Sequence, residues 1–229
     1  NVRADLNLPV PAKLPAVMNS SGPLTISASG DMRERGIITA LFPGMVRETK
    51  GQVRFDMTAT GTPTDPRLNG RLNLRGASAY LPAAGMDLKD VNADIAFNND
   101  RIDLTSLATR SGPGLINVTG RARHSRGRIT SFEAAVKGDR FQAVNLPELK
   151  SLLSPDITIT GNTEKITVRG RVVVPEALIS EERKENMIRP SKDVIIVGQE
   201  EAIPGLPFAL DLVVAVEMGD KVAVKAYGI

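Results

Sequence analysis

The side chains that could carry catalysis are few and scattered. His124 is the only histidine of the chain, and it lies among Arg121, Arg123, Arg126 and Arg128. A Ser-His-Asp arrangement needs a histidine held between a nucleophile and a carboxylate, and no particular serine or aspartate is marked out for either role. One histidine without any cysteine is also a poor source of zinc ligands. We therefore predict that His124 is a surface residue beside the arginines.

Four aspartates are close enough in sequence to suggest the paired carboxylates of a glycosidase. They are Asp87, Asp90, Asp94 and Asp103. They fall in turns or on the outward phase of strand patterns, where solvation accounts for them. No glycine-rich phosphate-binding loop is present. The sequence thus predicts no enzyme, no metal site and no cofactor.

The charge pattern argues against a nucleic-acid partner. Lys and Arg number 29 and Asp and Glu 26, mixed along the chain, and aromatic residues make up only 3%. Nucleic-acid-binding surfaces usually combine a basic stripe with interleaved aromatics. No apolar run is long enough to cross a membrane as a helix. The chain starts at Asn1 rather than Met and stops at Ile229 just after a strand pattern, so we expect a fragment of a longer protein.

The dominant pattern is an alternation of apolar and other residues. From Leu206 to Val216 every second residue is apolar, which is typical of a strand with one buried face. Gly and the turn sequence 98–100 (Asn-Asn-Asp) separate such segments. The polar phase, with residues such as Arg54, Asp56 and Asp94, would face water. Further strands are predicted around residues 2–8, 24–28, 53–59, 68–74, 91–97, 102–104, 116–122, 132–136, 157–159, 166–174 and 222–226.

Helix signals are few. Asp31 is placed to cap a short helix through Ile37 and Leu41 before Pro43, and a second helical turn is predicted from Pro147 to Leu153. The charged segment 180–191 is predicted to be a solvated loop.

A Gly-Arg pair recurs at 70–71, 120–121 and 170–171, at intervals of 50 residues. This spacing suggests a weak repeat of about four strands per unit around Gly70, Gly120 and Gly170. A glycine inside a strand often marks a bend or bulge. Chance recurrence is the alternative. We interpret residues 1–229 as a single elongated β domain.

Three segments near the C-terminal end have a specific order. Residues 153–161 (LSPDITITG) are followed by 166–177 (ITVRGRVVVPEA), a charged loop and 190–198 (PSKDVIIVG). This order resembles the C-terminal region of the TamB family of translocation and assembly module subunits. Earlier segments at 59–62, 66–70 and 74–77 are similar to the same family, so the resemblance spans roughly residues 50–229.

The resemblance implies an all-β fold, in which an elongated, curved, antiparallel-rich sheet forms a U-shaped, taco-like groove with an apolar interior. It also implies an AsmA-like, bridge-like lipid transfer protein, anchored in the inner membrane of a diderm bacterium and crossing the periplasm. The implied partner is a TamA-like outer-membrane protein of the Omp85 type, engaged through residues beyond Ile229. A link to outer-membrane protein assembly is implied as well.

We therefore expect the apolar phase to hold phospholipid acyl chains. Two alternatives stay open: a chaperone-like platform that binds nascent outer-membrane proteins through its sheet edges, and a structural spacer. The same phase would also form the core of a closed β fold. The predicted groove residues are Val53, Phe55, Met57, Leu72, Leu74, Ile95, Phe97, Ile116, Val118, Phe132, Val136, Ile157, Ile159, Ile166, Val168, Val172, Val174, Phe208, Leu210, Leu212, Val214 and Val216.

Overall fold

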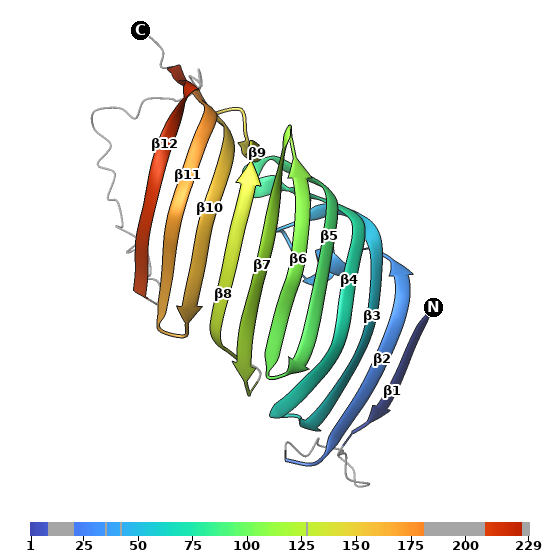
Figure 1. The fold of residues 1–229 in the computed structure, drawn as a ribbon. Coiled ribbons are helices and arrows are strands. Elements are labelled where there is room, and N and C mark those ends of the chain that lie inside the picture. Colours follow the sequence, from blue (N-terminus) through green and yellow to red (C-terminus); the bar gives the residue numbers. More distant parts are fainter. Residues whose placement is uncertain (9–20, 35, 42, 127, 181–208, 226–229) are drawn as a thin grey trace, which may run out of the picture.

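The computed structural model describes residues 1–8, 21–34, 36–41, 43–126, 128–180 and 209–225. Most of these residues belong to one open sheet of twelve strands (Figure 1). A period of two suits such a sheet because successive side chains point to opposite faces, which can then have different surroundings. The predicted all-β, antiparallel-rich fold is confirmed.

The strands lie across the sheet almost in chain order, β1-β2-β3-β4-β5-β6-β7-β8-β10-β11-β12, and the short β9 pairs with β10 outside this path. Neighbours are antiparallel except β11 and β12, which are parallel. The two short helices are α1 (Ile37–Leu41) and η1 (Pro82–Ala84). The strands are β1 (Val2–Asn7), β2 (Leu24–Arg33), β3 (Arg47–Thr62), β4 (Asp65–Leu81), β5 (Met86–Asn99), β6 (Arg101–Ser111), β7 (Gly114–Ser125), β8 (Arg128–Asp139), β9 (Phe141–Asn145), β10 (Leu149–Asn162), β11 (Lys165–Ser180) and β12 (Ala209–Lys225).

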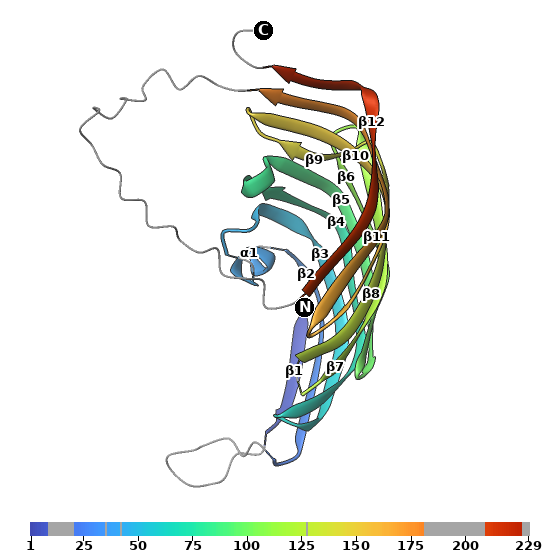
Figure 2. The same cartoon turned by 90° about the vertical axis from the view of Figure 1, so that its left-hand side faces the viewer.

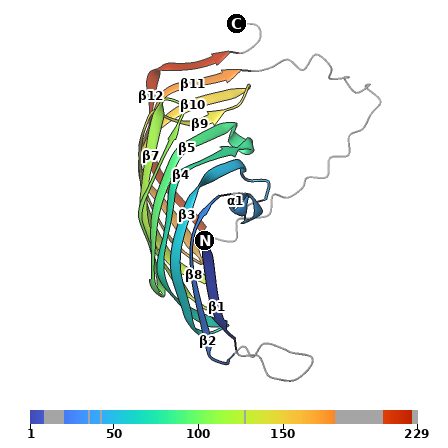
Figure 3. The ribbon, with the colours of Figure 1, turned by 90° about the vertical axis from the view of Figure 1, so that its right-hand side faces the viewer.

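The sheet is strongly curved. Figures 2 and 3 show the upper parts of β3, β4, β5, β10, β11 and β12 bending toward the side on which α1 lies. The pairings shift register in this part of the sheet, between Leu74 and Ala77 in β4 and between Val174 and Glu176 in β11. An extra residue on one strand bends that strand and increases its twist. The curvature therefore follows from local irregularities in otherwise regular strands.

The helix α1 lies on the concave side of the sheet next to β3 (Figure 2). Its position matches the predicted helix, but Asp31 as its cap is wrong, because Asp31 lies within β2. Glu34 caps α1 instead: Oε1 accepts hydrogen bonds from the backbone N–H of Gly36 (2.6 Å) and Ile38 (3.2 Å). In the described part of the chain, no helix has the length and apolar character needed to cross a membrane.

The helical turn predicted from Pro147 to Leu153 is also wrong. Leu149 begins β10, and Leu152 pairs with Gln142 on one side and Glu176 on the other. One isolated helical turn is unstable because it fixes several residues for one hydrogen bond, whereas this segment gains two neighbouring strands.

Candidate functional site: the apolar concave face

Three rows of side chains run across the sheet, two of them from β1 to β12 and one from β2 to β12. Residues in register on adjacent strands point to the same face, so each row can be followed from strand to strand. Every position in the three rows is apolar or glycine. The lower row is Ala4, Ala28, Met57, Gly70, Phe97, Ile102, Ala122, Phe132, Gly161, Ile166 and Leu210; the middle row is Val2, Gly30, Phe55, Leu72, Ile95, Leu104, Gly120, Ala134, Ile159, Val168 and Leu212; the upper row is Met32, Val53, Leu74, Ala93, Leu107, Val118, Val136, Ile157, Gly170 and Val214.

The register brings most of the predicted groove residues together in these rows. Ile116, Val172, Val174 and Val216 continue the same phase beyond the upper row, and Phe208 lies outside the described residues. The lower row holds the predicted Met57, Phe97, Phe132, Ile166 and Leu210; the middle row holds Phe55, Leu72, Ile95, Ile159, Val168 and Leu212; the upper row holds Val53, Leu74, Val118, Val136, Ile157 and Val214.

Leu107 is a face residue that simple alternation misses. Counting by twos from Ile102 and Leu104 would place Ser106 beside them. A register shift between Leu104 and Leu107 instead pairs Leu107 with Val118, while the Ser106 hydroxyl donates to Asp94 Oδ2 at 3.0 Å. The bulge thus keeps an apolar residue in the upper row. In the sequence, the signal for this bulge was Leu107 itself, a leucine one position out of the alternation set by Ile102 and Leu104.

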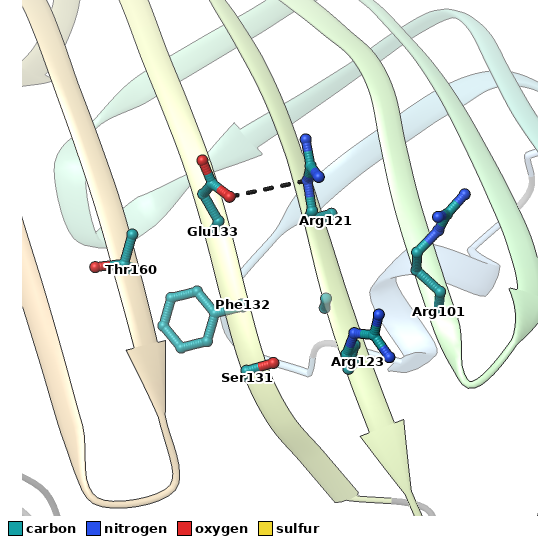
Figure 4. A pocket seen from close by; sticks show the side chains of 8 residues that line it. Arg101, Arg121, Arg123, Ser131, Phe132, Glu133 and Thr160 are labelled. Carbon is teal, nitrogen blue, oxygen red and sulfur yellow. Dashed lines mark ion pairs between the residues drawn. The ribbon is translucent and has the colours of Figure 1, made fainter.

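The opposite, convex face is polar. In Figure 4, Arg101, Arg121, Arg123 and Glu133 stand on the near side of the strands, whereas α1 lies behind the sheet. Since α1 is on the concave side, these charged residues are on the convex side. The row to which Arg121 and Glu133 belong is Arg3, Ser29, Asp56, Arg71, Ala96, Asp103, Arg121, Glu133, Thr160, Thr167 and Asp211. The three apolar rows therefore line the concave side.

The concave face is only partly covered. Ala93 of the upper row (4% exposed) is buried near the bend, and so is the predicted groove residue Val174 (9% exposed). The other predicted groove residues that the structure describes on β3 to β11 are half-buried. Within the described residues no second sheet lies over them (Figures 2 and 3). A closed β sandwich would bury this face against a partner sheet. The described part of the chain thus presents an open apolar surface.

The edge strand β12 is the most exposed part of that surface. Leu212 is 63% exposed and Met218 is 68% exposed, and Leu210 and Val216 are exposed as well. On the convex side, the Asp211 carboxylate lies 3.0 Å from Lys165 Nζ and 3.9 Å from Arg169. The hydrogen bond and charge of Lys165, with a smaller contribution from Arg169, hold the pKa of Asp211 below its usual value. These ion pairs tie β12 to β11.

The depression drawn in Figure 4 does not favour an anion site. Its volume is about 340 Å³, and Arg101, Arg121 and Arg123 line it. Each arginine already has a carboxylate partner: Asp103 at 2.8 Å, Glu133 at 3.8 Å and Asp100 at 3.2 Å respectively. The positive charges are therefore balanced within the convex face.

Two of the residues considered for catalysis, His124 and Asp94, make contacts within the sheet. His124 is buried (8% exposed), which corrects the predicted surface position, and its Nε2 lies 2.9 Å from the Asn99 carbonyl at the β5–β6 turn. The carboxylate of Asp94 is hydrogen-bonded by Arg75, Asn73 and Ser106, in that order of effect, and these partners lower its pKa. Among the described residues, no three His, Cys, Asp or Glu side chains come together as metal ligands.

The recurring Gly-Arg pairs share a geometry. Gly70, Gly120 and Gly170 lie in the three apolar rows, one in each, and the arginine after each glycine lies on the convex face. These arginines are in register with acidic residues on adjacent strands: Arg71 with Asp56, Arg121 with Asp103 and Glu133, and Arg171 with Asp156. The repeat itself, and the single-domain interpretation, stay predictions.

Comparisons with known proteins identify a family. The family model of the TamB C-terminal domain matches residues 105–229. Over 195 residues the chain is 26% identical to the translocation and assembly module subunit TamB of Haemophilus influenzae. That alignment covers 78% of the chain but only 15% of the relative's length. No solved structure matches the chain.

Proposed function

The chain belongs to the TamB C-terminal domain family, and we propose that its apolar concave face holds lipid acyl chains during transport between two membranes. The observation that carries the proposal is the continuity of the three apolar rows across the strands from β2 to β12. A continuous row lets an acyl chain move without meeting a polar barrier.

The chemistry of the rows suits an acyl chain. Aliphatic side chains form no directional bonds, so a chain that slides along them breaks no hydrogen bonds. Each methylene group removed from water contributes roughly 0.8 kcal/mol. Half-buried side chains such as Leu72 and Ile95 still expose apolar surface that an acyl chain could cover. An acyl chain on this face would therefore offset the cost of leaving a bilayer.

The length of the rows is also sufficient. The middle row crosses all eleven strands of the main path, and at about 4.8 Å between neighbouring strands it is roughly 48 Å long. The hydrocarbon core of a bilayer is about 30 Å thick, so one leaflet is about 15 Å. Several acyl chains could lie end to end along the row.

Family membership also supports a proposal for the wider setting of this chain. We propose a periplasmic location in a diderm bacterium, as part of an inner-membrane-anchored protein that carries phospholipid to the outer membrane. The name of the Haemophilus influenzae relative supports a role in a translocation and assembly module. An Omp85-type, TamA-like partner and a contribution to outer-membrane protein assembly belong to the same proposal.

Site-specific photo-crosslinking in cells tests the lipid proposal. A photoreactive amino acid replaces Leu72 in the middle row or, as the matched control, its neighbour Arg71 on the convex face. Mass spectrometry of the crosslinked protein should find phospholipid on the Leu72 variant and little on the Arg71 variant. Equal labelling at both positions, or none at Leu72 in a folded protein, would overturn the proposal.

One observation favours a second candidate function. β12 is a 17-residue edge strand with exposed apolar residues, and such an edge is a template for pairing with another strand. A chaperone-like platform for nascent outer-membrane strands would use it by β-augmentation. Val213→Lys charges the edge strand on the convex side and leaves the apolar rows unchanged. Lost outer-membrane protein assembly with normal lipid crosslinking at Leu72 would support this second function over lipid transport.

A further inference from the structure

Two phenylalanine rings lie directly over glycines on the concave face. If Gly30 carried a Cβ, that atom would stand 2.7 Å from Cε1 and Cζ of Phe55. At Gly161 a Cβ would stand 2.6 Å from Cζ of Phe132. Such separations are far below van der Waals contact of about 3.5–4.0 Å between carbon atoms. Each ring therefore occupies the space that any other residue at the glycine position would fill.

The backbone does not explain these two glycines. Gly70 and Gly170 have φ near +136° and +138°, a region that favours glycine, and an added Cβ would meet backbone atoms. Gly30 and Gly161 are not among the residues with positive φ. Their backbone dihedrals are open to any residue, so the obstacle to a Cβ is steric. At both positions the ring is the nearest obstacle, ahead of Val2 Cγ2 at Gly30 and the Lys165 carbonyl oxygen at Gly161, each at 3.2 Å.

The pairs also occupy the acyl path. Gly30 and Phe55 lie in the middle row and Phe132 and Gly161 in the lower row, so both belong to the concave face. The first pair is near the β1 edge, and the second is five strands away from Phe55 along the sheet order, at roughly 24 Å. A ring that lies flat over a glycine projects only slightly from the concave surface. A ring forced upright would obstruct the rows.

We propose that Gly30 and Gly161 are positioning residues that hold the rings of Phe55 and Phe132 flat, so that linear acyl chains can pass along the concave face. This inference rests on the proposed function and names its substrate class more closely. A methyl group at either glycine displaces the ring, and the nearest alternative for an aromatic side chain is another staggered χ1 rotamer. The displaced ring then stands in the path of the acyl chain.

The test measures lipid labelling of the intact protein in cells. A fatty acid with a photoactivatable group and an alkyne enters the phospholipids, and irradiation attaches it to protein in contact with the acyl chains. The yield on the purified protein is read by click fluorescence. We expect Gly161→Ala to lower the yield about 15-fold, because excluding two methylenes costs roughly fourfold each. Gly30→Ala should act in the same direction.

The double variant Gly161→Ala with Phe132→Ala separates obstruction from misfolding. It keeps the added methyl group but removes the ring, so labelling should return to within about twofold of that of Phe132→Ala alone, which lacks the ring but keeps the glycine. If the glycine served only folding, the double variant would be labelled as weakly as Gly161→Ala, and this would overturn the inference. Unchanged labelling of Gly161→Ala would overturn it as well. Absence of labelling in the unmodified protein would instead refute acyl-chain binding itself.

Discussion

Val118 and Thr119 are neighbours in β7, yet they belong to opposite chemical environments. Val118 is half-buried in an apolar row that reaches both β2 and β12, whereas Thr119 is exposed on a face where charges of opposite sign alternate. The concave face shows no ion pair along its rows, and the convex face is held by pairs such as Lys137–Asp156 (3.5 Å) and Arg171–Glu217 (3.5 Å). One sheet thus combines a solvated outer face with an inner face whose apolar surface is left for a ligand.

The largest effect is expected from a charge on the inner face. Val118→Asp places a carboxylate in the upper row, where partial desolvation should lower the free energy of unfolding by about 2 kcal/mol. Lipid labelling should fall tenfold or more, since an acyl chain gains nothing from contact with a carboxylate. Chemical denaturation and the labelling assay measure the two effects.

Thr119→Asp is the matched control for Val118→Asp. It adds the same charge one residue away on the convex face, near Arg121, and should leave both measurements nearly unchanged. Similar losses in the two variants would mean that the two faces are not functionally distinct.

A second comparison lies within the concave face. Val174 is buried near the bend, whereas Val172 is half-buried on the open part. Val174→Ala should cost about 2 kcal/mol of stability, because it removes packed atoms and leaves a cavity. Val172→Ala should cost about half as much. The midpoints of chemical denaturation measure the stability of the two variants. Equal losses of stability would indicate that the open part of the concave face is covered in solution.

The bend itself can be tested at Asp90. This residue has φ +52° within β5, a conformation that strains most side chains and suits glycine. Asp90→Gly should therefore stabilise the protein by about 0.5 kcal/mol. Asp87→Gly, in the same strand without positive φ, should destabilise it by a similar amount. Destabilisation by both substitutions would show that Asp90 is held by contacts that outweigh the backbone strain.

The smallest effect concerns the convex ion pairs of β12. The pKa of Asp211 is lowered by Lys165 and then Arg169, so its contribution to stability is present above the ordinary value of 3.8 and is lost as the pH falls through the lowered value. Acid should therefore loosen β12 from β11, seen as faster amide hydrogen exchange in β12 after correction for the intrinsic rate. Asp211→Asn should remove this pH dependence. Persistence of the full dependence in that variant would assign it to another carboxylate.

Local patterns in the sequence were enough to predict much of the fold. The alternation around Val53, Phe55 and Met57 is enough to predict a strand and its two faces, because side-chain direction in a strand depends only on position along it. The 98–100 turn likewise predicts the β5–β6 hairpin. Helix α1 was predictable in position, but its cap was not, since Glu34 is fixed partly by Thr49, 15 residues away in β3.

The features that only the tertiary structure decided depend on contacts between segments that are far apart in sequence. The parallel pairing of β12 with β11, the shift that brings Leu107 into the upper row and the burial of His124 under the Asn99 carbonyl all depend on which strands become neighbours. The same holds for the rings over Gly30 and Gly161, which are 25 and 29 residues from Phe55 and Phe132 in sequence. The sequence determined by itself that one phase of most strands is apolar, because that property is local. Register, curvature and the openness of the concave face arise only when the strands are assembled, because each depends on contacts between distant segments.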